Sequence, residues 1–111
     1  MNDKQRDIIY NCLYILYDLN HTINLLESIG IHIEGDISPN NIGSDIYSSI
    51  SKAYSILETV AEEICGTSEY VSEAIENLYA YDSNTTVSRD NAINTTMILF
   101  RDMPHNVNKE D

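Results

Sequence analysis

The strongest pattern in the chain runs from Asp7 to Gly30, where apolar residues recur at steps of three and four. This spacing is typical of one buried stripe on an α-helix. The stripe consists of Ile9, Cys12, Leu16, Leu19, Ile23 and Leu26. A second stripe, on the opposite side of the same helix, consists of Tyr10, Tyr14, Tyr17 and His21. A helix that is apolar nearly all round is either central in its own fold or shared with a partner.

We expect this first helix to span residues 3–29, with Asn2 or Asp3 as its N-cap and Gly30 in the left-handed position after its end. Residues 30–43 form a long connection for packed helices and contain three glycines and Pro39. Isoleucines at 31, 33, 37 and 42 indicate a loop that lies ordered on the rest of the protein. Within it, Ser38 and Pro39 predict one short helical turn.

Ser44 is predicted to cap a second helix that ends before Gly66, because its apolar positions again alternate by four and three. These positions are Ile46, Ile50, Ala53, Leu57, Val60 and Ile64, widened by Tyr47, Tyr54 and Ala61. A tight turn capped by Thr67 or Ser68 leads to a third helix over about 68–81, packed antiparallel to the second. Its core positions are Val71, Ala74, Ile75, Leu78 and Tyr81.

The last patterned segment, residues 88–103, has Ser88 as a candidate N-cap, with Ile93, Met97 and Phe100 at helical spacing. Residues 95–101 are also rich enough in β-branched and apolar side chains for a short buried strand. We favour a helix, because a lone strand would have no neighbour to pair with. The sequence therefore predicts an all-α fold: one domain over 1–103, a small bundle of about four helices, followed by a flexible polar tail at 104–111.

Charge changes this picture more than any motif does. Eighteen Asp and Glu face six Lys and Arg, which gives a formal net charge of −12 and a pI near 4.3. Direct binding to nucleic acid or to an anionic membrane is disfavoured, because both need clustered cations. The residue usage is that of an A+T-rich genome, yet lysine is scarce, which indicates that positive charge has been kept out. Drift in a short chain is the alternative explanation.

The acids are concentrated between Lys52 and Arg89, a stretch that contains no cation. They are Glu58, Glu62, Glu63, Glu69, Glu73, Glu76 and Asp82. One interpretation is an ordinary solvated face. The other is a surface for a basic partner, since carboxylates in rows on neighbouring helices can imitate the spaced charge of a nucleic-acid backbone.

The tyrosine stripe also has two interpretations. Tyrosines with solvated hydroxyls are enriched at protein interfaces, so the stripe can be a homodimer or partner surface. Alternatively, the third and fourth helices cover it, which we favour because they have little else to pack against.

The sequence contains no strong catalytic or metal-binding motif. Asp18 and His21 stand at i, i+3, but bundles that bind two metals need paired Glu-x-x-His motifs. Residues 36–47 lack the glycine and glutamate of a calcium loop. Cys12 sits at a core position, and no histidine is placed to activate it or Cys65. We expect no enzyme activity, no metal and no cofactor. With no secretory signal and no membrane span, the expected location is the cytoplasm.

The leading hypothesis is a non-enzymatic interaction protein whose acidic helical surface docks on a basic nucleic-acid-binding protein or nuclease complex and blocks it. Small size, strong negative charge and an A+T-biased sequence are typical of phage-encoded inhibitors of host defence. The first rival is an oligomerisation module, such as a homodimer, with the first helix as its seam. The second is a bundle that binds a small ligand near Asp18, His21 and the tyrosines.

Overall fold

The computed structural model describes residues 1–30, 42–84 and 86–103, and in this part of the chain it contains four α-helices and no strand. They are α1 (Asp3–Ser28), α2 (Ile42–Cys65), α3 (Val71–Asp82) and α4 (Arg89–Arg101). The predicted all-α bundle of four helices with a long first helix is confirmed. The predicted ordered loop, its short turn at Ser38 and the predicted tail at 104–111 fall outside the described residues.

The ends of α1 follow the predicted capping chemistry. The Asn2 side chain accepts a hydrogen bond from the Gln5 amide at 2.8 Å, and Gln5 Oε1 accepts one from the Asn2 amide at 3.0 Å. This reciprocal pair satisfies two amides that have no partner within the helix. At the other end, Ile29 is the C-cap and Gly30 has a φ of +89°, a backbone conformation that glycine adopts without steric strain.

Two predicted helix starts are wrong by a few residues. Helix α2 already begins at Ile42, so Ser44 lies inside its first turn rather than at its cap. Helix α3 begins at Val71 rather than near 68, and its N-cap residue, Tyr70, makes no side-chain capping bond. Thr67 Oγ1 instead accepts the Glu69 amide at 3.2 Å, which fixes a local turn before the helix. Gly66 ends α2 with a φ of +80°, as predicted.

The segment 95–101 belongs to α4 and is helical, which settles the choice between helix and strand. Ser88 caps this helix as predicted, accepting the Asn91 amide at 3.2 Å. Thr96 is the buried polar residue of α4, and its hydroxyl donates to the Ala92 carbonyl at 2.9 Å. A β-branched residue is therefore accommodated in the helix with its hydroxyl satisfied locally.

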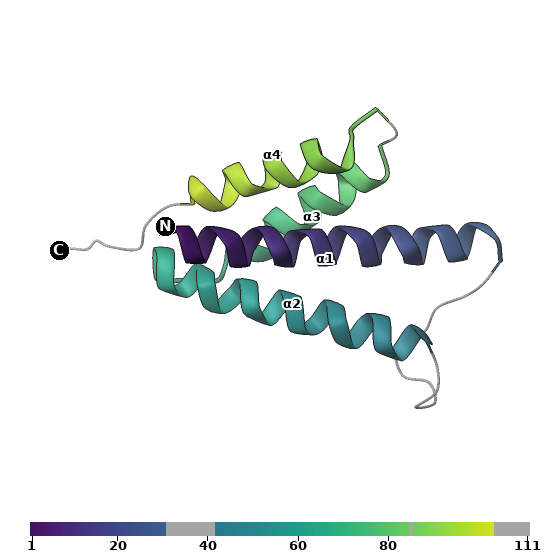
Figure 1. Ribbon diagram of the computed structural model, residues 1–111, viewed down its shortest axis with the longest axis horizontal. Helices are drawn as coiled ribbons and strands as arrows, with labels where there is room; N and C mark the ends of the chain where they lie inside the picture. The colour runs from purple at the N-terminus through teal and green to yellow at the C-terminus, as the bar shows by residue number, and fades with distance from the viewer. Residues whose placement is uncertain (31–41, 85, 104–111) are drawn as a thin grey trace.

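Helix α1 lies in the middle of the bundle (Figure 1). It packs against each of the other three helices, with α2 antiparallel on one side and the α3–α4 hairpin on the other. The most deeply buried side chains come from all four helices. They are Ile9, Leu13, Leu16, Leu57, Val71, Leu78, Ile93 and Phe100. The apolar circumference of α1 is therefore explained largely by its own fold.

The four helices differ in length, which decides where α1 is left uncovered. Helices α1 and α2 have 26 and 24 residues, whereas α3 and α4 have 12 and 13. The last turns of α1 thus have mainly α2 beside them, and Ile23 and Ile46 form a small separate cluster there. Among the described residues no helix is both long enough and apolar enough to cross a membrane.

Candidate interaction surfaces

Two tyrosines of the stripe on α1 contact α4. Tyr10 donates its hydroxyl proton to Asn94 Oδ1 at 3.2 Å, and Tyr14 donates to Asp90 Oδ1 at 3.3 Å. Loss of solvent and the neighbouring Asp90 carboxylate raise the pKa of Tyr14. Tyr17, the third tyrosine, is buried. The later helices therefore pack on this side of α1 and bury Tyr17, while Tyr10 and Tyr14 stay partly exposed and the His21 side chain is 51% exposed.

An ion pair fixes α4 to the same side of α1. Arg89 donates from Nε and Nη2 to the two carboxylate oxygens of Asp18, both at 2.7 Å, and its guanidinium lies 4.4 Å from the centre of the Tyr14 ring. The hydrogen bonds from Arg89 lower the pKa of Asp18. Both carboxylate oxygens of Asp18 therefore accept hydrogen bonds from Arg89. Asp18 is one of the two residues whose spacing in the sequence weakly suggested a metal site.

Asp82 lies in a polar cluster at the end of α3 and not on an acidic surface. Its carboxylate has no exposed area and accepts hydrogen bonds from Asn20 Nδ2 at 2.7 Å and Asn24 Nδ2 at 2.9 Å. His21 Nδ1 lies 2.9 Å from the other oxygen, and because a carboxylate only accepts, Nδ1 carries the proton. The His21 ring stacks on Tyr17, with 6.2 Å between ring centres. These contacts give His21 and Asp82 a structural role.

Five of the predicted acids form what we call the glutamate face, on α2, α3 and the turn between them. They are Glu58, Glu62, Glu69, Glu73 and Glu76. On α3, Glu73 and Glu76 lie opposite the buried positions Val71, Ala74 and Leu78, and Glu69 is exposed in the turn before the helix. On α2, Glu58 and Glu62 follow Tyr54 by one and two turns. Tyr54 is partly buried against the core, as Tyr79 of α3 is.

Glu63 is separate from this face. It points toward α1, where Gln5 Nε2 donates to its carboxylate at 3.2 Å. The predicted set of seven acids is thus divided by the structure: five belong to the glutamate face, Glu63 lies beside α1, and Asp82 is buried. Helical periodicity separates Glu62 from Glu63 by about 100°, but the burial of Asp82 depends on contacts between α1 and α3.

Charge pairing distinguishes the glutamates from the aspartates. Within the described residues, every ion pair of an arginine or histidine uses an aspartate: Asp3, Asp7, Asp18, Asp82, Asp90 or Asp102. No member of the glutamate face takes part in one. Glu62 also lies in the last turn of α2, where no basic residue is present and the helix dipole disfavours a negative charge. The described cations therefore leave the negative charge of this face unneutralised.

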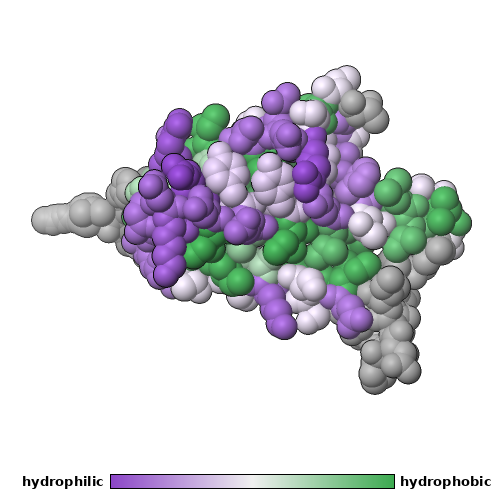
Figure 2. Space-filling view, in the orientation of Figure 1, coloured by the Kyte–Doolittle hydropathy of each residue, from purple (hydrophilic) through white to green (hydrophobic). Residues whose placement is uncertain are grey.

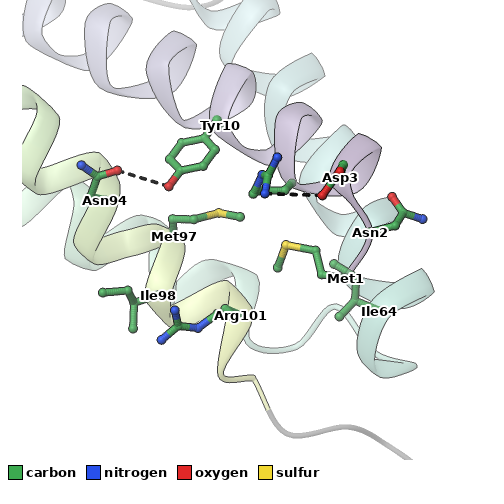
Figure 3. A pocket seen from close by; sticks show the side chains of 10 residues that line it. Met1, Asn2, Asp3, Tyr10, Ile64, Asn94, Met97, Ile98 and Arg101 are labelled. Atoms are coloured by element: carbon green, nitrogen blue, oxygen red, sulfur yellow. Dashed lines mark hydrogen bonds and ion pairs between the residues drawn. The ribbon is translucent and has the colours of Figure 1, made fainter.

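A cavity of about 310 Å³ lies where α1 begins and α2 and α4 end (Figure 3). Two arginines line it, but Arg6 pairs with Asp3 at 3.5 Å and Arg101 Nε lies 3.2 Å from Asp102. Its other walls include Tyr10, Asn94, Met97 and Ile98. Both arginines that line the cavity therefore already have acidic neighbours.

An apolar groove between α1 and α2 was not predicted. Its floor includes Cys12 and Ala53, and its edges carry Ile15 and Ile56, which are 43% and 45% exposed. Figure 2 shows this apolar patch over α1 and α2. A sequence signal existed, because Ile15 and Ile56 lie outside the main stripes of their helices, at positions where a polar residue is usual.

Catalytic and metal chemistry find little support in the described part of the chain. Burial raises the pKa of the Cys12 thiol, which makes it a poor nucleophile. Cys65 is buried and donates to the Ala61 carbonyl at 3.1 Å. No group of three His, Cys, Asp or Glu residues there is arranged to hold a metal ion.

Comparisons with protein-family models, curated proteins and solved structures found no match.

Proposed function

We propose that this protein is a non-enzymatic inhibitor whose glutamate face occupies the basic nucleic-acid-binding site of a partner protein. One observation supports this most: among the described residues, five carboxylates on α2, α3 and their connecting turn have no ion pair, while every arginine there pairs with an aspartate. Rigid helices hold these charges in place before binding, so little ordering entropy is lost.

The mechanism is electrostatic steering followed by competition. A net charge of −12 accelerates encounter with a basic site, and an unpaired carboxylate can take the place of a nucleic-acid phosphate. The partner class is a basic nucleic-acid-binding protein or nuclease complex. A phage or mobile-element origin, with action against host defence in the cytoplasm, fits the small acidic chain. The two free cysteines agree with a reducing compartment.

The test is capture followed by competition. The immobilised protein is incubated with nuclease-treated bacterial extract, and the retained proteins are eluted with increasing salt. We expect the immobilised protein to retain a basic protein. Duplex DNA should release this basic protein, and the free chain should inhibit its binding to nucleic acid. Retention of nothing basic, or of a protein that duplex DNA does not release, would contradict the proposal.

Two charge variants test the surface itself. Glu73→Gln with Glu76→Gln removes two charges from the glutamate face, and Glu27→Gln with Asp45→Asn removes two exposed charges elsewhere. Both variants have the same net charge. We expect only the first to weaken inhibition by about tenfold, since each lost charge contact contributes of the order of 1 kcal/mol. Equal weakening by both would indicate attraction by net charge alone.

The two alternative functions, an oligomerisation module and a bundle that binds a small ligand, stay predictions. The side chains that each would use already make contacts within the chain. An oligomerisation seam on the tyrosine side of α1 would have to displace α4 from Tyr10 and Tyr14. A small ligand near Asp18 and His21 would have to compete with Arg89 and Asp82 for those side chains. No observation favours either of them at those positions.

A further inference from the structure

The groove between α1 and α2 is continuous over much of both helices. It consists of two hollows, of about 470 and 490 Å³, that meet at Ile56. The apolar lining comprises Ile8, Cys12, Ile15, Leu19, Ala53, Ile56 and Val60. Exposed isoleucines at its edge are hydrophobic surface that another chain could bury.

The charged residues that line the groove alternate in sign. At one end, Lys4 of α1 stands across from Glu63 of α2, next to the contact between Gln5 and Glu63. At the other end, Asp18 of α1 stands across from Lys52 of α2. The formal charges of these four residues sum to zero although the chain carries −12. Asp18 also keeps its ion pair with Arg89 of α4, so Glu63 is the anion of the groove without an ion pair among the described residues.

This pattern is complementary to itself. If a second copy is turned by a two-fold axis that crosses the helices, α1 meets α1 in antiparallel fashion, Lys4 faces Asp18 and Lys52 faces Glu63. If the axis runs along the helices, α1 meets α2, Lys4 faces Glu63 and Lys52 faces Asp18. Either arrangement brings one lysine of each copy to Glu63 of the other, and the second lysine to Asp18, which Arg89 also contacts.

We propose that a second copy of this chain docks on the α1–α2 groove and forms a two-fold symmetric dimer. A strongly acidic chain can self-associate only where its own charge is balanced, and this groove is such a place. A basic partner would gain little there. The glutamate face lies on the other side of α2 and stays free in the dimer, so the proposal is independent of the inhibitory function.

The experiment is sedimentation equilibrium of the full chain over a range of concentrations at low and moderate salt. We expect the wild-type mass to rise from the monomer value of 12.6 kDa toward twice that. Ile56→Glu should weaken the dimer by at least about tenfold, because it places a charge in the apolar centre of the interface. Ile98→Glu is the matched control: Ile98, on α4, is also 45% exposed and lies outside the groove.

Exchanging the charges of facing residues then identifies which of the two possible two-fold axes relates the copies. Glu63→Lys alone should weaken the dimer in both arrangements. Adding Lys52→Glu restores it only if α1 meets α1, and adding Lys4→Glu restores it only if α1 meets α2. Circular dichroism melts confirm that each variant is folded.

Three results would overturn the proposed dimer. The wild-type chain could stay monomeric, Ile56→Glu could leave the dimer as strong as in the wild type, or neither Lys52→Glu nor Lys4→Glu could restore the dimer that Glu63→Lys weakens. If the wild-type chain is a monomer and Ile56→Glu abolishes its binding to another protein, the groove is the binding site for that protein instead.

Discussion

Arg89 and Asp18 face each other through two parallel hydrogen bonds of 2.7 Å, which join the first turn of α4 to the middle of α1. The pair brings the guanidinium over the ring of Tyr14, whose hydroxyl donates to Asp90. One arginine thus connects a carboxylate and an aromatic ring of α1 with the start of α4. It also fixes the register in which α4 packs on the tyrosine stripe.

The strength of this pair can be measured by a double-mutant cycle with Asp18→Asn and Arg89→Gln. Both side chains are about half exposed, so solvent screens their attraction. We expect a coupling free energy of about 0.5–1 kcal/mol from urea unfolding, helped by the bidentate geometry. A coupling near zero would show that the pair does not hold α4 in place.

The same pair makes stability depend on pH in the acid range. Hydrogen bonds from Arg89 lower the pKa of Asp18 in the folded state, so the unfolded chain takes up a proton at higher pH than the folded one. The stabilisation is fully present above the unfolded pKa of about 4 and is lost as the pH falls through the folded value. The stability difference between wild type and Asp18→Asn should shrink between pH 5 and pH 3, as followed by urea unfolding, with little change between pH 6 and pH 8.

Asp82→Asn tests the buried polar cluster. The substitution replaces one accepting oxygen by an NH₂ group that faces donors from α1, so at least one buried hydrogen bond is lost. We expect destabilisation of about 1–3 kcal/mol in thermal or urea unfolding. Glu73→Gln, an exposed carboxylate on the same helix, should change stability by less than about 0.5 kcal/mol. Equal effects would contradict a structural role for Asp82.

Adjacent positions on α1 distinguish core from groove. Leu16 is fully buried and Ile15 is largely open, so Leu16→Asp should unfold the chain or cost more than about 4 kcal/mol. Ile15→Asp should leave the circular dichroism spectrum and the melting temperature nearly unchanged. A folded Leu16→Asp variant would show that α1 is not the centre of the monomer.

Thr96→Val tests how α4 accommodates its buried hydroxyl. The hydroxyl bonds only to the carbonyl of its own helix, and that carbonyl keeps its backbone partner when the hydroxyl is removed. We expect a change within about 0.5 kcal/mol, or a small gain, because a methyl group of the same shape needs no hydrogen bond. A loss above about 1.5 kcal/mol would indicate a partner for the hydroxyl beyond Ala92.

The parts of the fold that could be predicted are those that depend on local chemistry. The capping residues Asn2 and Ser88, the glycines that end α1 and α2, and the buried stripes all follow from the order of nearby residues. The start of α3 was misplaced because Thr67 forms its own turn rather than a helix cap. The sequence allows both structures at this position, and neighbouring contacts select between them.

The candidate surfaces were only partly predictable. Composition alone identified an excess of acids, and helical periodicity places Glu73 and Glu76 opposite the buried side of α3. Periodicity cannot show that Asp82 is drawn into a cluster of α1 side chains, nor that Glu63 turns toward Gln5. The apolar groove depends on how far two helices stand apart at Ile15 and Ile56, which no pattern within one helix records.

The sequence by itself determined the four helices, the caps of α1 and α4, the glycines that end α1 and α2, and the strong negative charge of the chain. The helices and their caps depend on residues within one or two turns of each other, and the charge depends on composition alone. The tertiary structure decided which carboxylates are neutralised, which tyrosines are covered and which isoleucines stay open. The reason is physical: pairing and burial join residues far apart in the chain, such as Asp18 with Arg89 and Asn20 with Asp82, and they require the helices to be packed first.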